Sequence, residues 1–488
     1  MGAATDQVYL VLFGAGLAAA GASGVTATVG GVSAPVVYAG PQGAFAGVDQ
    51  VNVMLPASLA GKGTVNRASR CVLIGDGFMR SSNCTHRRMG SLALPAVFLL
   101  PPPVHGQAAA NWKFDFATSP PGVYSKETGN GLEPDFPMSH DKPFFFSVAV
   151  PEGNYRVTVT LGDRELASEN TVYAELRRLM VEHVRTAPGK FETRTFLVNV
   201  RQPKIAAGGA VRINERERTT EAWAWDDRLT LEFNGSHPAV RSVEIEKVDV
   251  PTLFLMGDST VCDQPREPFN SWGQTITRFL KPEIAVSNQA ESGESIAGAF
   301  GKGRLDKIWG DLKRGDYLFI QFAHNDMKNT EANALETYTN MLRAAVEQTR
   351  KRGGIPVLLT PVSRRTFDAQ GKIANSFNGY PGAVKLVAKE LNVPLIDLQA
   401  MTAAFYEAMG PDASHQAFAN AAENTHHSDY GSYEIAKAIV QRIKDIKLPL
   451  ADLTVDDFRG FDPSRPDRFE DVGIPPSPLV TNVTPLGN

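Results

Sequence analysis

Short apolar runs alternate with helical segments between residues 252 and 448, and this alternation constrains the fold more than any other feature. The helical segments lie at 334–352 and 381–391, and the amphipathic pattern of Ala436, Ile439 and Ile443 predicts a closing helix. Strands that alternate with helices favour a parallel sheet covered on both faces, which is an α/β fold. The predicted strands are five apolar runs, at 252–256, 283–287, 317–322, 356–360 and 394–398.

A glycine closes the first of these apolar runs, and a serine lies two residues beyond it, in Gly-Asp-Ser at 257–259. A strand that ends in such a turn lifts the following side chains out at the carboxyl edge of the sheet, where α/β folds keep their sites. The tripeptide alone is a weak signal, because turns favour all three residue types. Three later segments strengthen it: Ala-Glu-Ser-Gly-Glu-Ser at 290–295, His-Asn-Asp at 324–326 and Asn-Thr-His at 424–426.

These segments together supply the parts of an acyl-transfer site. Ser259 offers a hydroxyl nucleophile, which needs a base within hydrogen-bond reach to attack at neutral pH. His426 can be that base, and Glu423 can accept the other ring N–H and hold the tautomer. We therefore predict Ser259, His426 and Glu423 as catalytic residues. The predicted oxyanion hole consists of the backbone N–H groups of Ser259 and Gly293 and the side-chain amide of Asn325.

Two adjacent histidines, His426 and His427, raise the alternative of a metal site. Neighbouring residues in a loop rarely point to one ion, and no third ligand is spaced nearby, so we expect no metal and no organic cofactor. Cys262 lies close to Ser259, but no motif converges on it, and we interpret it as a buried thiol. The chain has 3 cysteines, too few for a disulfide framework.

The four blocks and their order resemble the SGNH (GDSL) hydrolase superfamily. Within it, they resemble the rhamnogalacturonan acetylesterases of carbohydrate esterase family twelve. Ser-Trp-Gly-Gln at 271–274 is similar to a further family stretch. The resemblance covers about 250–448 and implies a three-layer α/β/α, flavodoxin-like domain. It also implies a serine acetylesterase, a carboxylic ester hydrolase that works through an acetyl-Ser259 intermediate.

Two positions depart from the family pattern. Ala323 stands where the third block usually has glycine, and we expect its methyl group to be tolerated if φ is negative. Glu423 stands where the last block usually begins with aspartate. Its extra methylene can still reach the imidazole. The alternative is that Asp429, or no carboxylate, is the third member of the triad.

An acetylated polysaccharide, either rhamnogalacturonan (pectin) or xylan, is the substrate that the resemblance implies. We predict Asp258, Trp272, His324 and His427 as substrate-binding residues. One alternative is a lipase, lysophospholipase or thioesterase on the same scaffold, which requires an exposed apolar groove beside Ser259. The other is a carbohydrate-binding protein with a degenerate esterase domain.

Residues 110–249 have an all-β pattern. The segment resembles the N-terminal module of longer family members, which implies a galactose-binding-like sandwich. Runs of β-prone residues at sandwich-like spacing predict strands at 144–150, 155–161, 191–200, 210–214, 228–233 and 240–247.

The N-terminal part carries two unusual segments. Residues 1–68 are β-prone and resemble the truncated end of an Ig-like domain that recurs in secreted proteins of acidobacteria. Residues 79–108 combine a basic stretch, a short apolar run and small residues, which is the layout of a secretory signal peptide. We infer a native start at Met79, with 1–78 as a fusion or start-site artefact, and a secreted or periplasmic bacterial protein. Residues 449–488 are expected to form an irregular tail.

Charge and hydropathy exclude two classes of partner. The net charge is −4 and the chain has no basic block, so we expect no nucleic-acid partner. The apolar stretch at 10–22 is too short and too rich in glycine to span a bilayer, so no membrane insertion is expected.

Overall fold

The computed structural model describes residues 9–14, 25–29, 32–41, 49–56, 72–73 and 111–486. The chain divides into two compact units, Met1–Val104 and His105–Asn488. The signal-peptide-like segment at 79–108, and with it the inferred start at Met79, lies outside the described residues. Among the helices that are described, none has the length and apolar character needed to cross a membrane.

The described strands of the first unit form two three-stranded sheets, which agrees with the β-prone pattern of 1–68. Five small apolar residues form their core: Val25, Ala27, Ala34, Val51 and Val53. One sheet has the order β1-β5-β4, from Tyr9–Gly14, Asp49–Met54 and Val36–Pro41. The other has the order β3-β2-β6, from Val32–Ala34, Val25–Val29 and Val72–Leu73.

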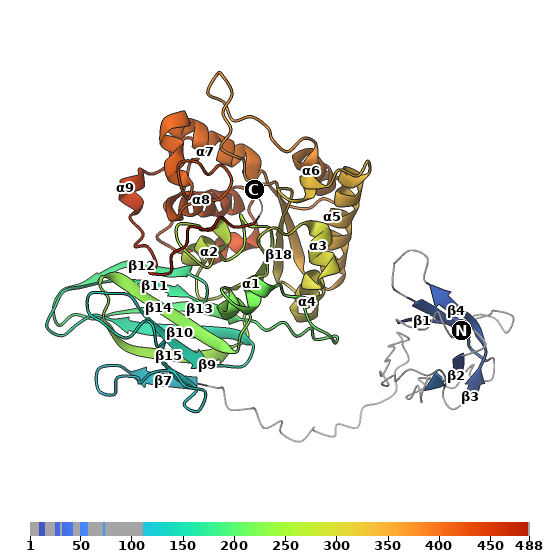
Figure 1. The fold of residues 1–488 in the computed structure, drawn as a ribbon, viewed down its shortest axis with the longest axis horizontal. Coiled ribbons are helices and arrows are strands. Elements are labelled where there is room, and N and C mark those ends of the chain that lie inside the picture. The colour runs from blue at the N-terminus through green and yellow to red at the C-terminus, as the bar shows by residue number, and fades with distance from the viewer. Residues whose placement is uncertain are drawn as a thin grey trace, which may run out of the picture. The chain divides into compact units, whose positions relative to one another are not determined.

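A five-stranded parallel sheet forms the centre of the α/β domain, residues 252–448 (Figure 1). Its order is β17-β16-β18-β19-β20, so the first strand of the domain lies second in the sheet, as in flavodoxin-like folds. The predicted parallel sheet is therefore confirmed, with strand ends shifted by one or two residues. The strands are β16 (Thr252–Gly257), β17 (Ala285–Asn288), β18 (Tyr317–Gln321), β19 (Ile355–Leu359) and β20 (Leu395–Ile396).

Helices cover both faces of this sheet. Successive side chains of each strand point to opposite faces, so the apolar strands present an apolar surface on each side. In β16, Leu253 and Leu255 face one apolar cluster, and Phe254 and Met256 face the other. The first cluster is closed by α2 (Trp272–Thr275), α7 (Leu398–Ala413) and α8 (Asp429–Asp445). The second is closed by α3 (Ile296–Gly301), α4 (Arg304–Asp311), α5 (Ala334–Lys351) and α6 (Tyr380–Glu390), on the other side of β18 in Figure 1.

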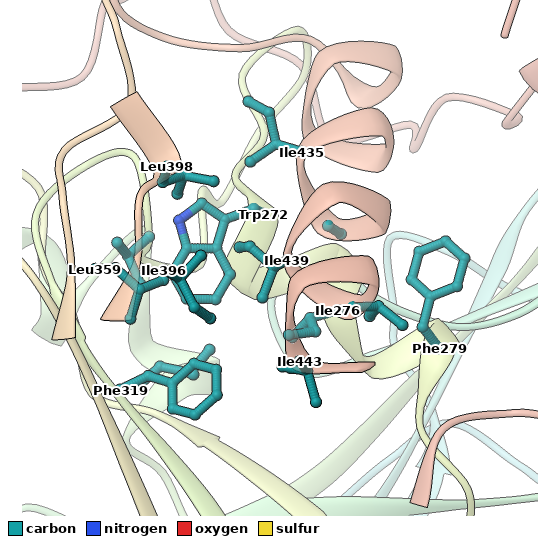
Figure 2. Packing of buried hydrophobic residues seen from close by; sticks show 14 of the residues in the cluster. Trp272, Ile276, Phe279, Phe319, Leu359, Ile396, Leu398, Ile435, Ile439 and Ile443 are labelled. Carbon is teal, nitrogen blue, oxygen red and sulfur yellow. The ribbon is translucent and has the colours of Figure 1, made fainter. Parts of the chain in front are cut away.

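Trp272 lies at the centre of the first cluster, between α8 and the sheet (Figure 2). Its ring is surrounded by apolar side chains that include Ile396 of β20 and Ile439 of α8. The indole N–H donates to Oε1 of Gln321, 2.8 Å away, so the one polar atom of this buried ring is satisfied.

Two antiparallel sheets with a shared apolar core form the β module, residues 111–248. One has the order β13-β10-β15-β7 and the other β12-β11-β14-β9-β8. The all-β prediction is confirmed, while the galactose-binding-like relationship stays a prediction. The strands are β7 (Asn111–Asp115), β8 (Asn130–Leu132), β9 (Phe144–Ala149), β10 (Gly153–Leu161), β11 (Ser168–Ala174), β12 (Arg178–Thr186), β13 (Glu192–Val200), β14 (Arg228–His237) and β15 (Val240–Val248).

The strand predicted at 210–214 was wrong. Ala210 makes only an isolated bridge to Lys204, and Asn214 is the N-cap of a short helix, α1 (Glu215–Arg218). Asparagine caps a helix well because its side-chain oxygen accepts a backbone N–H of the first turn. The segment between β13 and β14 therefore leaves the module as a loop and helix.

The turn between β11 and β12 inserts two arginines into the α/β domain. Arg177 donates to the carbonyl of Phe269 at 2.7 Å, and Arg178 donates to the carboxylate of Asp263 at 2.8 Å. Glu175 and Arg177 have φ of 56° and 58°, a conformation that side-chain-bearing residues seldom adopt. The module and the α/β domain thus share buried polar contacts within one compact unit.

Residues 449–486 are mostly irregular, with only η8 (Pro449–Leu453) and α9 (Phe469–Val472) as regular elements. The last part is nevertheless tied to both domains. Tyr173 of the β module donates to the carbonyl of Pro475 at 2.6 Å. Glu267 exchanges backbone hydrogen bonds with Leu479 and Thr481, at 2.7 and 2.8 Å.

Candidate active site

Ser259 lies in the turn that follows β16, at the carboxyl edge of the sheet. β16 ends at Gly257. This position has no room for a side chain, because a Cβ there would lie 2.5 Å from the carbonyl oxygen of Gln321. Asp258 fixes the turn, since its carboxylate accepts the backbone N–H of Thr260 at 3.0 Å and its hydroxyl at 2.8 Å. Gln264 holds the serine's own backbone by donating to its carbonyl at 2.7 Å.

His426 is brought to this serine by the loop before α8. Nε2 of His426 lies 3.0 Å from Oγ of Ser259. The edge of the imidazole faces the ring of Phe269, with ring centres 6.0 Å apart. Ser259 and His426 have exposed fractions of 0% and 1%, so the pair is shielded from water. At this distance and in this environment the imidazole can take the hydroxyl proton.

Glu423 lies on the other side of the imidazole. Its Oε2 is 3.3 Å from Nδ1 of His426, an ion-pair distance. Its Oε1 accepts the backbone N–H groups of Asn424, Thr425 and His426, at 3.0, 2.9 and 3.2 Å. Burial opposes ionisation, but the hydrogen bond and charge of His426 and these N–H groups lower the pKa of Glu423 to about 2. The carboxylate is therefore ionised and fixed in place.

The alternative third member, Asp429, is engaged elsewhere. Its Oδ1 lies 3.2 Å from the guanidinium of Arg177, and it also accepts the side-chain amide of Asn270. Asp429 begins α8, where a carboxylate is favoured by the helix dipole. The geometry thus favours Glu423 over Asp429 as the partner of His426.

The three predicted oxyanion donors follow three adjacent strands: Ser259 follows β16, Gly293 follows β17 and Asn325 follows β18. The loop of Gly293 is tied to both neighbours. The N–H of Glu291 donates to the carbonyl of Gly257 at 3.2 Å, and the amide of Asn325 donates to the carbonyl of Glu294 at 3.0 Å. Within the described residues, the backbone N–H groups of Ser259 and Gly293 donate to no protein acceptor. Both are available to an oxyanion.

Ala323, in the family's glycine position, has φ of +147°. The expected condition for tolerating its methyl group, a negative φ, is therefore wrong. The residue is fully buried and lies between β18 and the loop that carries Asn325. A residue with a side chain strains the backbone at this φ, whereas glycine adopts it without strain.

Three of the four predicted substrate-binding residues make contacts inside the protein. Trp272 belongs to the apolar core, and Asp258 is used up in holding its own turn. His427 shares a 2.7 Å hydrogen bond with the hydroxyl of Tyr406, and burial, followed by the charge of His426, lowers its pKa to about 3. His324 lies 3.2 Å from Asp258 through Nδ1, while its Nε2 has no hydrogen-bond partner among the described residues. Substrate contact stays a prediction for all four residues, each of which is at most 1% exposed.

A cleft of about 560 Å³ opens beside the loop that carries His426. Two cations in this cleft, Lys328 and Arg364, were not predicted. Arg364 has no carboxylate partner in the described part of the chain, and burial lowers its pKa against the opposing field of Asp258. Burial, and then the charge of Arg364, likewise lower the pKa of Lys328. The lining residues are Met327, Lys328, Arg364, Asn420, Ala422, Glu423, Asn424, Thr425 and Thr484.

Position in the fold could have revealed two of these residues. Lys328 comes two residues after the His-Asn-Asp block, and Arg364 follows β19, so both lie beyond the carboxyl ends of strands. Nothing in the sequence pattern indicates Thr484, because the tail has no periodicity that predicts where it lies. The same tail brings Leu486 close to Gly293, where a Cβ would lie 2.9 Å from that of Leu486.

The fold and these loops agree with what comparisons of the sequence find. The GDSL-like Lipase/Acylhydrolase family matches residues 255–433. The chain is 38% identical over 214 residues to the rhamnogalacturonan acetylesterase RhgT of Bacillus subtilis, covering 41% of this chain and 92% of that protein. It is 34% identical over 210 residues to the probable rhamnogalacturonan acetylesterase YesY of the same bacterium, covering 41% and 95%.

A third relative extends beyond the α/β domain. The uncharacterized esterase YxiM of Bacillus subtilis is 26% identical over 306 residues, which cover 61% of this chain and 74% of that protein. The chain belongs to the GDSL-like lipase/acylhydrolase family, the SGNH hydrolases, which are carboxylic ester hydrolases.

Proposed function

We propose that the chain is a serine acetylesterase that removes O-acetyl groups from acetylated pectic polysaccharide. The observation that carries the proposal is the 3.0 Å contact between Nε2 of His426 and Oγ of Ser259, with the Glu423 carboxylate on the far side of the ring. In a chain of this ester-hydrolase family, that contact gives a hydroxyl with a base in place. The acetyl group is proposed from the two relatives named as acetylesterases.

The reaction runs in two similar halves. Oγ of Ser259 attacks the acetyl carbonyl carbon while its proton passes to Nε2 of His426. The oxyanion that forms accepts hydrogen bonds from the N–H groups of Ser259 and Gly293 and the amide of Asn325. The intermediate collapses, the sugar oxygen leaves with the proton from His426, and an acetyl-Ser259 ester remains. Water then attacks this ester while its proton passes to His426. Acetate leaves as His426 returns the proton to Oγ of Ser259.

The two cations in the cleft favour pectin over xylan. Arg364 and Lys328 both line the cleft beside the catalytic loop. Burial lowers the pKa of each, and the charge of Arg364 lowers the pKa of Lys328 further. A substrate carboxylate would relieve this, because charge-assisted hydrogen bonds are the stronger kind. Rhamnogalacturonan offers a uronate carboxylate in its backbone, whereas the xylan backbone is neutral.

The structure gives less support to the two alternatives, a lipase-type enzyme and a carbohydrate-binding protein with a degenerate esterase domain. A lipase needs an apolar groove, but among the described residues that line the cleft only Met327 and Ala422 are apolar. A degenerate esterase domain, used only to bind carbohydrate, has no need of a serine and histidine at 3.0 Å with a fixed carboxylate behind them. The esterase explains both features.

We further propose that the protein is secreted or periplasmic. Its proposed substrate is a polymer that lies outside the cell, and the sequence at 79–108 has the layout of a secretory signal peptide. Mass analysis of the N-terminus of the exported protein tests this: cleavage near Ala109 is expected. A mature product that begins well upstream would contradict it.

Acetate release tests the function directly. Wild type and Ser259→Ala are compared on acetylated rhamnogalacturonan, acetylated xylan, 4-nitrophenyl acetate and a long-chain 4-nitrophenyl ester, with the exposed Ser464→Ala as a matched control. We expect acetate from rhamnogalacturonan above all, and a loss of turnover on the order of a millionfold in Ser259→Ala alone. Preference for the long-chain ester would favour the lipase, and inactivity on all four would favour the binding protein.

A further inference from the structure

We propose that the β module supplies a positioning residue to the esterase site: Arg216 holds the Ser292–Gly293 peptide so that the Gly293 N–H faces the oxyanion. The inference rests on the acetylesterase function proposed above, because it assigns Gly293 as an oxyanion donor. It gives the β module a part in catalysis whether or not the module binds sugar.

Arg216 lies on α1, which leaves the β module between β13 and β14. The helix is fixed at its start, because Asn214 accepts the N–H of Glu217 at 3.1 Å and Glu217 accepts the N–H of Asn214 at 2.8 Å. From this turn the Arg216 guanidinium pairs with the carboxylate of Glu291 and donates to the carbonyl of Ser292 at 3.0 Å. Asn214 donates to the same Glu291 carboxylate at 3.0 Å.

The contact with the Ser292 carbonyl is the one that acts on the oxyanion hole. This carbonyl and the N–H of Gly293 belong to one planar trans peptide and point in opposite directions. A group that fixes the oxygen therefore fixes the direction of the N–H. Among the described residues, Arg216 alone donates to this oxygen.

Gly293 makes such a hold necessary. Its φ is +77°, and it has no Cβ to restrict the flanking peptides. It is also exposed, with Leu486 of the C-terminal tail as its near side-chain neighbour. Without a partner for the Ser292 carbonyl, the peptide can rotate and turn the N–H away from the oxyanion.

The same short helix reaches a second oxyanion donor by another route. Glu217 accepts Arg304 at 2.7 Å, and Arg304 in turn donates to the carboxylate of Glu294 at 3.1 Å. The backbone carbonyl of Glu294 accepts the amide of Asn325 at 3.0 Å. Contacts from α1 therefore lead to both predicted oxyanion donors outside the serine turn, Gly293 and Asn325.

Electrostatics make Arg216 hard to replace. Burial, followed by the charges of Glu221 and Glu217, raises the pKa of Glu291 to about 8, and Arg216 is one of the two cations that oppose this. Removing it leaves this buried cluster of acidic side chains with one cation fewer, which is an unfavourable arrangement. The loop that carries Gly293 is then expected to shift.

The test compares Arg216→Met with Arg218→Met. Arg218 is on the same helix but is exposed, and its one ion pair is with Glu215 at 3.8 Å. With 4-nitrophenyl acetate, and with active sites counted by a fluorophosphonate, we expect kcat per active site to fall about tenfold to hundredfold in Arg216→Met, less than the loss of a whole donor. KM is expected to change by less than about threefold, because the oxyanion forms only in the transition state. Arg218→Met is expected to match wild type.

A transition-state mimic separates positioning from folding. A boronic acid that forms a tetrahedral adduct with the serine should lose affinity for Arg216→Met in parallel with kcat, while a purely structural role would only lower the number of active sites. If counted Arg216→Met sites turn over at the wild-type rate, the inference is wrong even though the esterase stands. Activity retained by Ser259→Ala would instead overturn the proposed function itself.

A second variant keeps the test decisive if Arg216→Met does not fold. Arg216→Lys preserves the charge beside Glu291, but a shorter side chain with an ammonium group replaces the guanidinium nitrogen that donates to both Glu291 and Ser292. We expect it to fold and to lose kcat with KM nearly unchanged. Full wild-type kcat in Arg216→Lys would contradict the need for the hydrogen bond to the Ser292 carbonyl.

Discussion

The Glu423 carboxylate lies 3.3 Å from Nδ1 of His426 with one oxygen, while the other oxygen caps three backbone N–H groups of the same loop. The longer side chain thus does two things at once. It anchors the loop that carries His426, and it presents a negative charge to the imidazole. This geometry fits the prediction that Glu423 can take the place of the aspartate that the family resemblance leads us to expect.

Glu423→Gln is expected to lower kcat far more than Glu423→Asp. The amide of glutamine turns an N–H toward Nδ1 and stabilises the tautomer with Nε2 protonated, which cannot take the Ser259 proton. We expect a loss on the order of 10⁴-fold for Glu423→Gln, the size seen when a triad acid becomes an amide. Glu423→Asp keeps the charge and should lose far less. Steady-state kinetics on 4-nitrophenyl acetate measure both, and equal losses would contradict Glu423 as the triad acid.

The low pKa of Glu423 predicts how stability depends on pH. Its pKa is about 2 in the folded chain against 4.5 ordinarily, so the folded state favours the ionised form. The stabilisation is present above pH 4.5 and is lost as pH falls toward 2. Thermal unfolding of wild type and Glu423→Gln across this range should show a Tm difference that is constant near neutral pH and shrinks in acid. The other carboxylates cancel in this difference. If the Tm difference between wild type and Glu423→Gln grew as the pH fell, the pKa of Glu423 would be raised in the folded chain and the prediction would be wrong.

Arg364→Met is expected to raise KM for acetylated rhamnogalacturonan about tenfold, which corresponds to about 1.4 kcal/mol for a charge-assisted contact. Acetylated xylan and 4-nitrophenyl acetate have no backbone uronate, so their KM should not change. Arg314→Met removes the same charge from an exposed turn before β18 and is the matched control. A KM that rises equally for all three substrates would mean that Arg364 shapes the cleft without binding a carboxylate.

Much of the fold was predictable, because parallel strands buried on both faces are continuous apolar runs. The runs at 317–322 and 356–360 became β18 and β19 almost without change. β11 and β12 escaped prediction for a physical reason. Ser168, Asn170 and Thr171 of β11 are polar but buried, so alternation between polar and apolar residues is absent there.

Some residues of the candidate site could also be predicted from the sequence, and others could not. Ser259, Gly293, Asn325 and His426 were found because each lies in a short motif just beyond a strand or before a helix. Thr484 and Arg216 were not, because each reaches the site through a contact between segments that are remote in the sequence. Arg364 was not singled out although it follows β19. Trp272 was predicted as a substrate contact from its place in a family motif, and the structure places its ring in the apolar core.

Ala323→Gly is expected to stabilise the protein. The residue is held at φ of +147°, a conformation that costs a side-chain-bearing residue about 1–3 kcal/mol. Glycine removes this strain but adds freedom to the unfolded chain, worth about 0.4–1 kcal/mol. The net expected gain is about 1 kcal/mol in the free energy of unfolding, measured by chemical denaturation. Ala299→Gly is the control, because Ala299 is equally buried but lies within α3, where glycine should cost about 1 kcal/mol. If both variants were destabilised alike, the backbone at Ala323 would not be strained, and the missing family glycine would have no energetic consequence.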